Sequence, residues 1–185
     1  MKLFRSNKRK GGDRVYMDYA ASTPVDPSVV KAMEPYWSEV YGNAGSHHHE
    51  GRAAKSAIAK ARNTCAEILG AESEEIIFTG SGTESNNLAI FGVIGAALQR
   101  GQKISDMHFV TTPIEHPSAL DCFKHLEKQG ATVTYLAVDR DGLVEPKDVE
   151  GAIRRNTVLV SIMFVNNEMG AIEPIGEIGK SIHRL

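Results

Sequence analysis

The sequence has few cysteines, no long apolar run and no large excess of either charge. Its 185 residues include two cysteines, Cys65 and Cys122. That number is too small for a disulfide framework and is typical of a reducing, cytoplasmic compartment. No apolar run reaches the length of about 20 residues that spans a bilayer. The formal net charge of −2 also gives no sign of nucleic-acid binding. We therefore expect a cytoplasmic protein that binds neither a membrane nor, directly, nucleic acid.

Residues 1–14 are rich in lysine and arginine. No apolar segment follows these charges, so the stretch does not have the pattern of a secretory signal. We expect a solvated, flexible basic tail, and an arm that binds a polyanion is the alternative.

The full chain is 42% hydrophobic and 24% charged, which is ordinary for a globular protein. One domain is therefore expected from residue 15 to residue 185.

Strand patterns alternate with helical patterns along most of the chain. A helix is expected from Pro27, with Asp26 as its N-cap, to about Val40, and a second from Glu50 to Leu69, with Gly70 as its stop. Pro117 and Pro174 are expected to open later helices. The helical patterns that hold Cys65 and Cys122 make both thiols structural, and Cys65 is expected to be buried on an apolar helix face. The run 157–165 is nearly all apolar, which predicts a strand buried on both faces. The pattern indicates an α/β fold with a mostly parallel sheet covered by helices. The expected strands, each followed by a helix, are 76–79, 108–111, 132–138 and 157–165.

A glycine-rich turn lies between the first expected strand and its helix. The stretch 76–90 reads IIFTGSGTESNNLAI, and the free amides at a helix N-terminus form an anion site. The third glycine of G-x-G-x-x-G is absent, and so is the lysine of a P-loop. A single terminal phosphate is the anion that fits best. Considered alone, the stretch fits an ordinary capped turn about equally well.

Polar pairs follow three of the expected strands, namely Gly82–Thr83, Glu115–His116 and Asn166–Asn167. Ligands of α/β sheets bind beyond the carboxyl ends of the strands, so these pairs are expected to converge and favour the anion site over a plain turn. The run 47–49 consists of three histidines. Metal ligands on one helix face need i, i+4 spacing, so we expect no metal site there.

Four segments stand out in order along the chain, namely YMDYAASTP (16–24), FTGSGTESNNLAI (78–90), IEHPSAL (114–120) and VSIMFVNNEMGAIEPI (160–175). Together they resemble the NifS/IscS-type cysteine desulfurases, which are pyridoxal 5'-phosphate (PLP) enzymes of fold type I in the class V aminotransferase family. Several motifs in the family's order are more specific than any one of them, and the resemblance extends over residues 15–185. It implies that the chain is the N-terminal part of a PLP-dependent transferase large domain.

The resemblance also implies roles for individual residues. Gly82 and Thr83 would hold the PLP phosphate on the helix N-terminus. His116 would be catalytic, lying over the pyridine ring and helping to move protons. Asn167 would form a hydrogen bond with the 3-oxygen of the ring, while Asn166 would be structural.

One part of the resemblance is imperfect. His48 matches the histidine of the family pattern GNPSS-x-H-x-x-GR, and one of the three adjacent histidines is expected to face a pocket. Ala44 and Gly45 stand where the family has proline and serine. This departure affects the expected rigidity of the loop, and it leaves the family assignment unchanged.

The family has four functional residues that this sequence lacks. They are the lysine that binds PLP covalently in an S-x-H-K motif, the aspartate that pairs with the pyridinium nitrogen, the mobile cysteine that accepts sulfur and the arginine that binds the substrate carboxylate. In the family all four lie downstream of the position of Leu185. We therefore expect this chain to be an inactive fragment of a longer, homodimeric enzyme.

The reaction implied by the resemblance converts L-cysteine to L-alanine. Sulfur passes to an enzyme cysteine as a persulfide and then to an acceptor such as an iron–sulfur scaffold protein, for cluster assembly or for tRNA thiolation. Cys65 and Cys122 are not expected to be the sulfur carrier, because that nucleophile must be a mobile thiol of low pKa. The alternatives are a non-catalytic partner subunit with the PLP fold and a related class V enzyme such as selenocysteine lyase.

Overall fold

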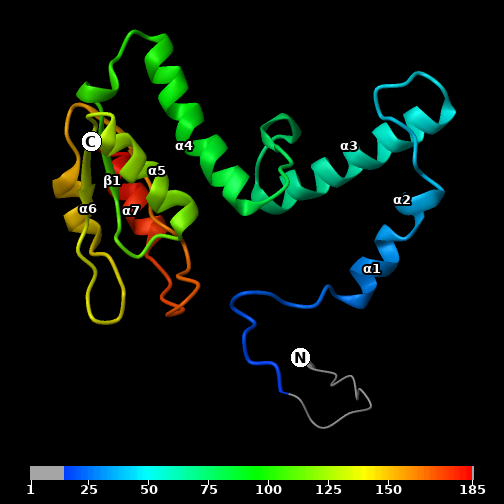
Figure 1. Ribbon diagram of the computed structural model, residues 1–185, viewed down its shortest axis with the longest axis horizontal. Coiled ribbons are helices and arrows are strands. Elements are labelled where there is room, and N and C mark those ends of the chain that lie inside the picture. The colour runs from blue at the N-terminus through cyan, green and yellow to red at the C-terminus, as the bar shows by residue number, and fades with distance from the viewer. Residues whose placement is uncertain (1–14, 185) are drawn as a thin grey trace. The chain divides into compact units, whose positions relative to one another are not determined.

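A computed structural model describes residues 15–184 of the chain. The predicted basic tail, residues 1–14, lies outside the described residues. The chain forms two compact units that meet in sequence after Ile77 (Figure 1). No helix in the described part of the chain combines the length and the apolar character needed to cross a membrane.

The first unit begins with two short helices, α1 (Pro27–Met33) and α2 (Pro35–Ser38). Asp26 caps α1 by accepting a hydrogen bond from the Ser28 amide at 2.8 Å, and Pro27 is the first helical residue, as predicted. The prediction of one helix to Val40 is wrong, because Pro35 starts a second helix. A proline inside a helix removes one backbone donor, and its ring clashes with a carbonyl of the preceding turn.

The long helix α3 (His49–Leu69) is followed by a short 3-10 helix, η1 (Ser73–Glu75). Gly70 ends α3 at the expected position, in the left-handed conformation with φ 66°. Cys65 is only partly buried, so the prediction of a buried thiol is wrong. Helical periodicity identifies the apolar face of a helix, but it does not show what covers that face.

The segment 76–79 is extended but forms no strand, so this part of the prediction is wrong. Ile77 is 68% exposed and Phe78 is 51% exposed. An apolar, β-branched run becomes a strand only where a neighbouring strand takes its backbone hydrogen bonds. Within the described residues no strand pairs with it.

The second unit contains a parallel sheet with the order β2-β1-β3. Strand β1 (His108–Thr111) is central and fully buried, as a parallel strand covered on both sides should be. Strand β2 (Thr132–Tyr135) is shorter than the predicted 132–138. Strand β3 (Thr157–Val160) lies at an edge and is half-buried. The predicted strand 157–165, buried on both faces, is therefore wrong in length and in burial. Beyond Val160 the chain leaves the sheet for a loop that is closed by an antiparallel bridge between Val165 and Ile172.

Helices cover both faces of this sheet. Successive side chains of a strand point to opposite faces. Phe109 accordingly packs in a cluster with α4 (Gly82–Gln99) and α5 (Pro117–Lys128), and Val110 packs in a cluster with α6 (Pro146–Ala152) and α7 (Ile175–Ile182). The rings of Phe109 and Phe123 lie 6.0 Å apart at the centre of the first cluster. The short helix η2 (Ile104–Asp106) precedes β1. The predicted α/β fold with a parallel sheet is confirmed.

A buried histidine joins the three strands. His108 on β1 contacts the Thr134 hydroxyl of β2 through Nε2 and the Thr157 hydroxyl of β3 through Nδ1, each at 2.8 Å. Burial lowers the pKa of His108, and the nearby positive charge of Arg154 adds to this effect. The ring is therefore held neutral inside the sheet.

Candidate functional site

The turn before α4 presents free backbone amides. Ser81 caps the helix, and its hydroxyl accepts a hydrogen bond from the Glu84 amide at 3.1 Å. The Glu84 carboxylate accepts one from the Gly80 amide at 2.6 Å. Among the described residues, the amides of Gly82 and Thr83 have no acceptor. These two donors lie at the positive end of the helix dipole, an arrangement that favours binding of an anion.

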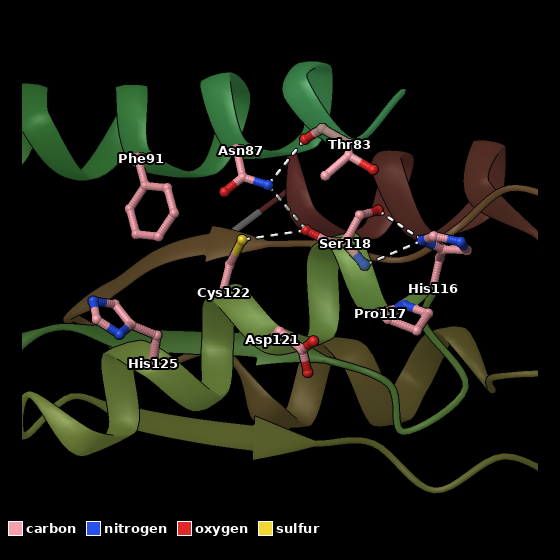
Figure 2. A pocket seen from close by; sticks show the side chains of 9 residues that line it. All are labelled: Thr83, Asn87, Phe91, His116, Pro117, Ser118, Asp121, Cys122 and His125. Atoms are coloured by element: carbon pink, nitrogen blue, oxygen red, sulfur yellow. Dashed lines mark hydrogen bonds between the residues drawn. The ribbon is translucent and has the colours of Figure 1, made fainter. Parts of the chain in front are cut away.

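The side chains of two asparagines join the start of α4 to the start of α5, and Figure 2 shows one of them, Asn87. Asn87 Nδ2 donates to the Thr83 carbonyl at 2.9 Å and to the Ser118 carbonyl at 3.4 Å. Asn86 Nδ2 donates to the Ser118 hydroxyl oxygen at 2.8 Å. Thr83 and His116 therefore sit on helix ends that are fixed to each other.

His116 is the N-cap residue of α5 and lies between two cavities. Its Nδ1 accepts a hydrogen bond from the Ser118 amide at 3.1 Å, and the Ser118 hydroxyl lies 2.8 Å from the same nitrogen. The larger cavity, between α4 and α5, has a volume of about 590 Å³. The smaller cavity, of about 350 Å³, is also lined by Glu115 and by the end of β3. The larger cavity is lined by Thr83, Asn87, Phe91, His116, Pro117, Ser118, Asp121, Cys122 and His125 (Figure 2).

Glu115, next to His116, connects the loop after β1 to the chain after β3. The side chain is 8% exposed. Its Oε1 accepts hydrogen bonds from the Met163 amide at 2.6 Å and from the Thr112 hydroxyl at 3.3 Å. Burial raises the pKa of Glu115 above its usual value. The negative charge of Glu173 acts in the same direction.

Asn166 makes a second connection between the same two loops. It is 4% exposed, and its Nδ2 donates to the Ile114 carbonyl at 3.0 Å. Its Oδ1 accepts from the amides of Glu168 and Met169, at 2.9 and 2.8 Å. These contacts agree with the structural role expected for Asn166.

The structure brings together only some of the predicted site residues. Thr83 and His116 line the larger cavity, and Gly82 immediately precedes Thr83 at the start of α4. The side chain of Asn167 is exposed, and Asn167 lines neither of these two cavities. The role of Asn167 therefore stays a prediction.

His48 belongs to the first unit, where it caps α3. Its Nδ1 accepts a hydrogen bond from the Gly51 amide at 3.3 Å and lies 3.0 Å from Glu50 Oε2. Gly42 and Gly51 lie where a Cβ atom would overlap backbone atoms. The glycines of this pattern are thus needed for close loop packing. That one of the three adjacent histidines faces a pocket stays a prediction.

Cys122 has the surroundings of a structural thiol. It is buried, and its Sγ donates to the Ser118 carbonyl at 3.2 Å. Burial raises the pKa of the thiol, and the nearby Asp121 carboxylate raises it further. The reactive thiolate is therefore disfavoured, which agrees with the expectation that Cys122 does not carry sulfur.

Residues 15–185 match the family described as Aminotransferase class-V. The chain belongs to the class V aminotransferase family. Class V aminotransferases and cysteine desulfurases are PLP-dependent, so the cofactor predicted from the sequence is confirmed for the family. Over 166 residues the chain is 49% identical to cysteine desulfurase IscS of Dictyoglomus turgidum. Over 170 residues it is 46% identical to the mitosomal cysteine desulfurase of Encephalitozoon cuniculi.

These alignments cover 90% and 91% of this chain but 41% and 39% of the relatives, so the chain spans about two fifths of their length. Among solved structures, SspA in complex with cysteine is 43% identical with a TM-score of 0.84, and a NifS-like protein is 37% identical with a TM-score of 0.85. The chain covers 47% and 46% of those structures, which cover 91% and 92% of this chain.

The donor groups at the start of α4 fit the phosphate of PLP. The two free amides of Gly82 and Thr83 suit a phosphate monoester. An added Cβ at Gly82 would meet no atom within 4 Å, so the backbone there is open to a ligand. The Glu84 carboxylate already accepts the hydrogen bond of the Gly80 amide at 2.6 Å, so the free amides at this turn are those of Gly82 and Thr83.

The roles of three residues that organise the site, Asn86, Glu115 and Ser118, were not identified from the sequence. Asn86 and Ser118 are 32 positions apart, and Glu115 and Met163 are 48 positions apart. No local spacing rule connects such pairs. The one available signal was the position of Glu115 beside His116, after a strand.

Proposed function

We propose that this chain forms the PLP-binding part of a cysteine desulfurase. The observation that carries the proposal is the shared cavity. Thr83, at the amide-rich start of α4, and His116, at the start of α5, both line it. The identity of 49% to a cysteine desulfurase supports the assignment. The substrate proposed for the whole protein is L-cysteine, supported by the similar solved structure that is described as a complex with cysteine.

When bound, PLP supplies an electron sink for breaking bonds at the α-carbon of an amino acid. The amides of Gly82 and Thr83 and the Thr83 hydroxyl would hold its phosphate. His116 would lie over the pyridine ring as the catalytic residue of this chain. Asn167 would donate a hydrogen bond to the 3-oxygen of the ring.

The proposal for the whole protein also covers its reaction, its sulfur acceptor, its compartment and its oligomeric state. L-Cysteine would be converted to L-alanine, and sulfur would pass to a cysteine outside this chain and then to an acceptor such as an iron–sulfur scaffold protein. The relatives named IscS support a role in iron–sulfur cluster assembly, and tRNA thiolation is the second use proposed. The whole protein is proposed to be a cytoplasmic homodimer.

The cofactor site can be tested on the 185-residue chain by binding PLP and pyridoxal, which lacks the phosphate. We expect PLP to bind more tightly. The variant Gly82→Pro removes one free amide but places proline at the first helical position, where a helix tolerates it. Because a hydrogen bond to a charged group contributes about 1.5–3 kcal/mol, PLP affinity should fall about 10- to 100-fold.

The matched control is Gly92→Ala in the middle of α4, where an added Cβ meets no atom within 4 Å. This variant should bind PLP like the wild type. Equal binding of PLP and pyridoxal, or unchanged PLP binding by Gly82→Pro, would contradict the phosphate assignment.

The proposed activity must be tested on the protein in the form that its native cell makes. Supplied with PLP and L-cysteine, that protein should release alanine. Release of alanine from selenocysteine alone would indicate a selenocysteine lyase. No product from either substrate would instead support the non-catalytic partner subunit.

A further inference from the structure

The two ring nitrogens of His116 have different surroundings. Nδ1 lies 3.1 Å from the Ser118 amide and 2.8 Å from the Ser118 hydroxyl oxygen. Within the described residues Nε2 makes no hydrogen bond. Nε2 is therefore the nitrogen that remains available on a ring that borders both cavities.

The backbone contact determines where the proton of the neutral ring lies. A backbone N–H can only donate, so Nδ1 must accept from the Ser118 amide and must present its lone pair. In a neutral imidazole one nitrogen accepts and the other carries the proton. The proton of His116 is therefore on Nε2.

The direction of these hydrogen bonds also determines the one between Ser118 and Asn86. If Nδ1 presents a lone pair, the Ser118 hydroxyl donates toward it, and the Ser118 oxygen is free to accept. Asn86 Nδ2 lies 2.8 Å from that oxygen and donates to it. The reverse direction would place an Nδ1 proton against the Ser118 amide proton. One backbone N–H thus sets the direction of the whole series of hydrogen bonds, from Asn86 through Ser118 to His116. Figure 2 shows the part of the series between Ser118 and His116.

We propose that the Ser118 amide holds His116 in the Nε2–H tautomer, and that Asn86 and the Ser118 hydroxyl are positioning groups whose hydrogen bonds run in the direction that this tautomer requires. The ring then offers a hydrogen-bond donor at Nε2 and keeps its lone pair on the side of Ser118. The part that concerns catalysis, a donor presented to the cofactor or to the substrate, rests on the proposed function. The tautomer itself depends only on this chain.

The experiment is a long-range ¹H–¹⁵N NMR spectrum of the histidine side chains of the 185-residue chain without PLP, at a pH where imidazoles are neutral. The variant His116→Gln identifies the His116 signals by their loss. Wild type should show a pyridine-type Nδ1 and a pyrrole-type Nε2. A pyrrole-type Nδ1 in the wild type would overturn the proposal.

The variant Asn86→Asp reverses the series of hydrogen bonds. The new carboxylate accepts from the Ser118 hydroxyl, whose lone pair then faces Nδ1. The pyridine-type Nδ1 signal should therefore be lost or should shift toward the protonated form. In the double variant Asn86→Asp, Ser118→Ala the charge remains but the hydroxyl is absent, so the wild-type signature should return.

An unchanged spectrum in Asn86→Asp would overturn the proposal. A change that persists in the double variant would also overturn it, because the negative charge alone would then explain the change. Should Asn86→Asp fail to fold, Ser118→Asp makes the same test. It places an acceptor beside Nδ1 in the first turn of α5, where an acidic residue is favoured, and the Nδ1 signal should be lost. Failure of the wild-type chain to bind PLP would contradict the proposed function and leave the tautomer assignment standing.

Discussion

Replacing Glu115 should change stability in a way that depends on pH. The Glu115 carboxyl is 8% exposed and accepts hydrogen bonds from the Met163 amide at 2.6 Å and the Thr112 hydroxyl at 3.3 Å. Glu115→Leu keeps a side chain of similar size but removes both acceptors. The Met163 amide, the closer of the two donors, then loses its partner inside the protein.

The expected loss follows from that amide. Leaving a buried donor without an acceptor costs about 1–3 kcal/mol, and the longer contact to Thr112 adds less. Burial raises the pKa of Glu115 above its ordinary value of 4.5, so the folded state holds the proton more strongly than the unfolded state does. This contribution to stability is complete below pH 4.5 and is lost as the pH rises through the folded-state pKa. Leucine has no such contribution, so Glu115→Leu should lose more stability at about pH 5 than at about pH 8.

Urea unfolding of the 185-residue chain at both pH values measures this difference. Glu115→Gln keeps an acceptor and resembles the protonated carboxyl, so it should lie within about 1 kcal/mol of the wild type and have a flatter pH dependence. Glu127→Gln is the matched control, because Glu127 is exposed and accepts one hydrogen bond, from the Tyr135 hydroxyl. Our account of Glu115 is refuted if Glu115→Leu matches the wild type at both pH values, or loses more at the higher one.

Three further predictions concern His108, Phe123 and the two cysteines. The pKa of His108 is lowered by burial and by Arg154, so the folded state binds fewer protons there. Wild-type stability should fall as the pH drops below about 6.5, and His108→Gln should lack this part of the slope in urea unfolding. Phe123→Ala empties the fully buried position against Phe109 and should lower the free energy of unfolding by about 3–5 kcal/mol in the same assay. The double variant Cys65→Ser, Cys122→Ser should leave alanine release by the native protein within about twofold of wild type, because burial raises the pKa of Cys122, and an inactive double variant would contradict this.

Local signals predicted the helix ends well. Asp26 caps α1 and Gly70 ends α3. Prolines begin α1 and α5, and Pro174 directly precedes α7. Each of these signals acts on backbone groups a few residues away, so both partners of the interaction can be found in a short stretch of sequence. Pro35 was a local signal of the same kind. The prediction passed over it because the helical spacing of apolar residues continues on both sides of Pro35.

Strands were predicted less completely because a strand depends on its neighbours. The run 108–111 is a strand as predicted, since β2 and β3 lie on either side of it. The run 76–79 has similar composition but no partner within the described residues, and it stays unpaired. The apolar run 157–165 leaves the sheet after Val160, although its composition is that of one continuous strand.

The sequence alone determined the alternation of strands and helices from β1 onward, the parallel sheet and the cap of the turn before α4. It also predicted that the residues after the strands would gather, and Thr83 and His116 do line one cavity. Only the tertiary structure decided how His116 is held and how Glu115 and Asn166 join their loops. The hydrogen bonds concerned link residues 32, 48 and 52 positions apart. Such contacts form only after the helices have packed on the sheet, because packing brings together groups that no sequence spacing relates.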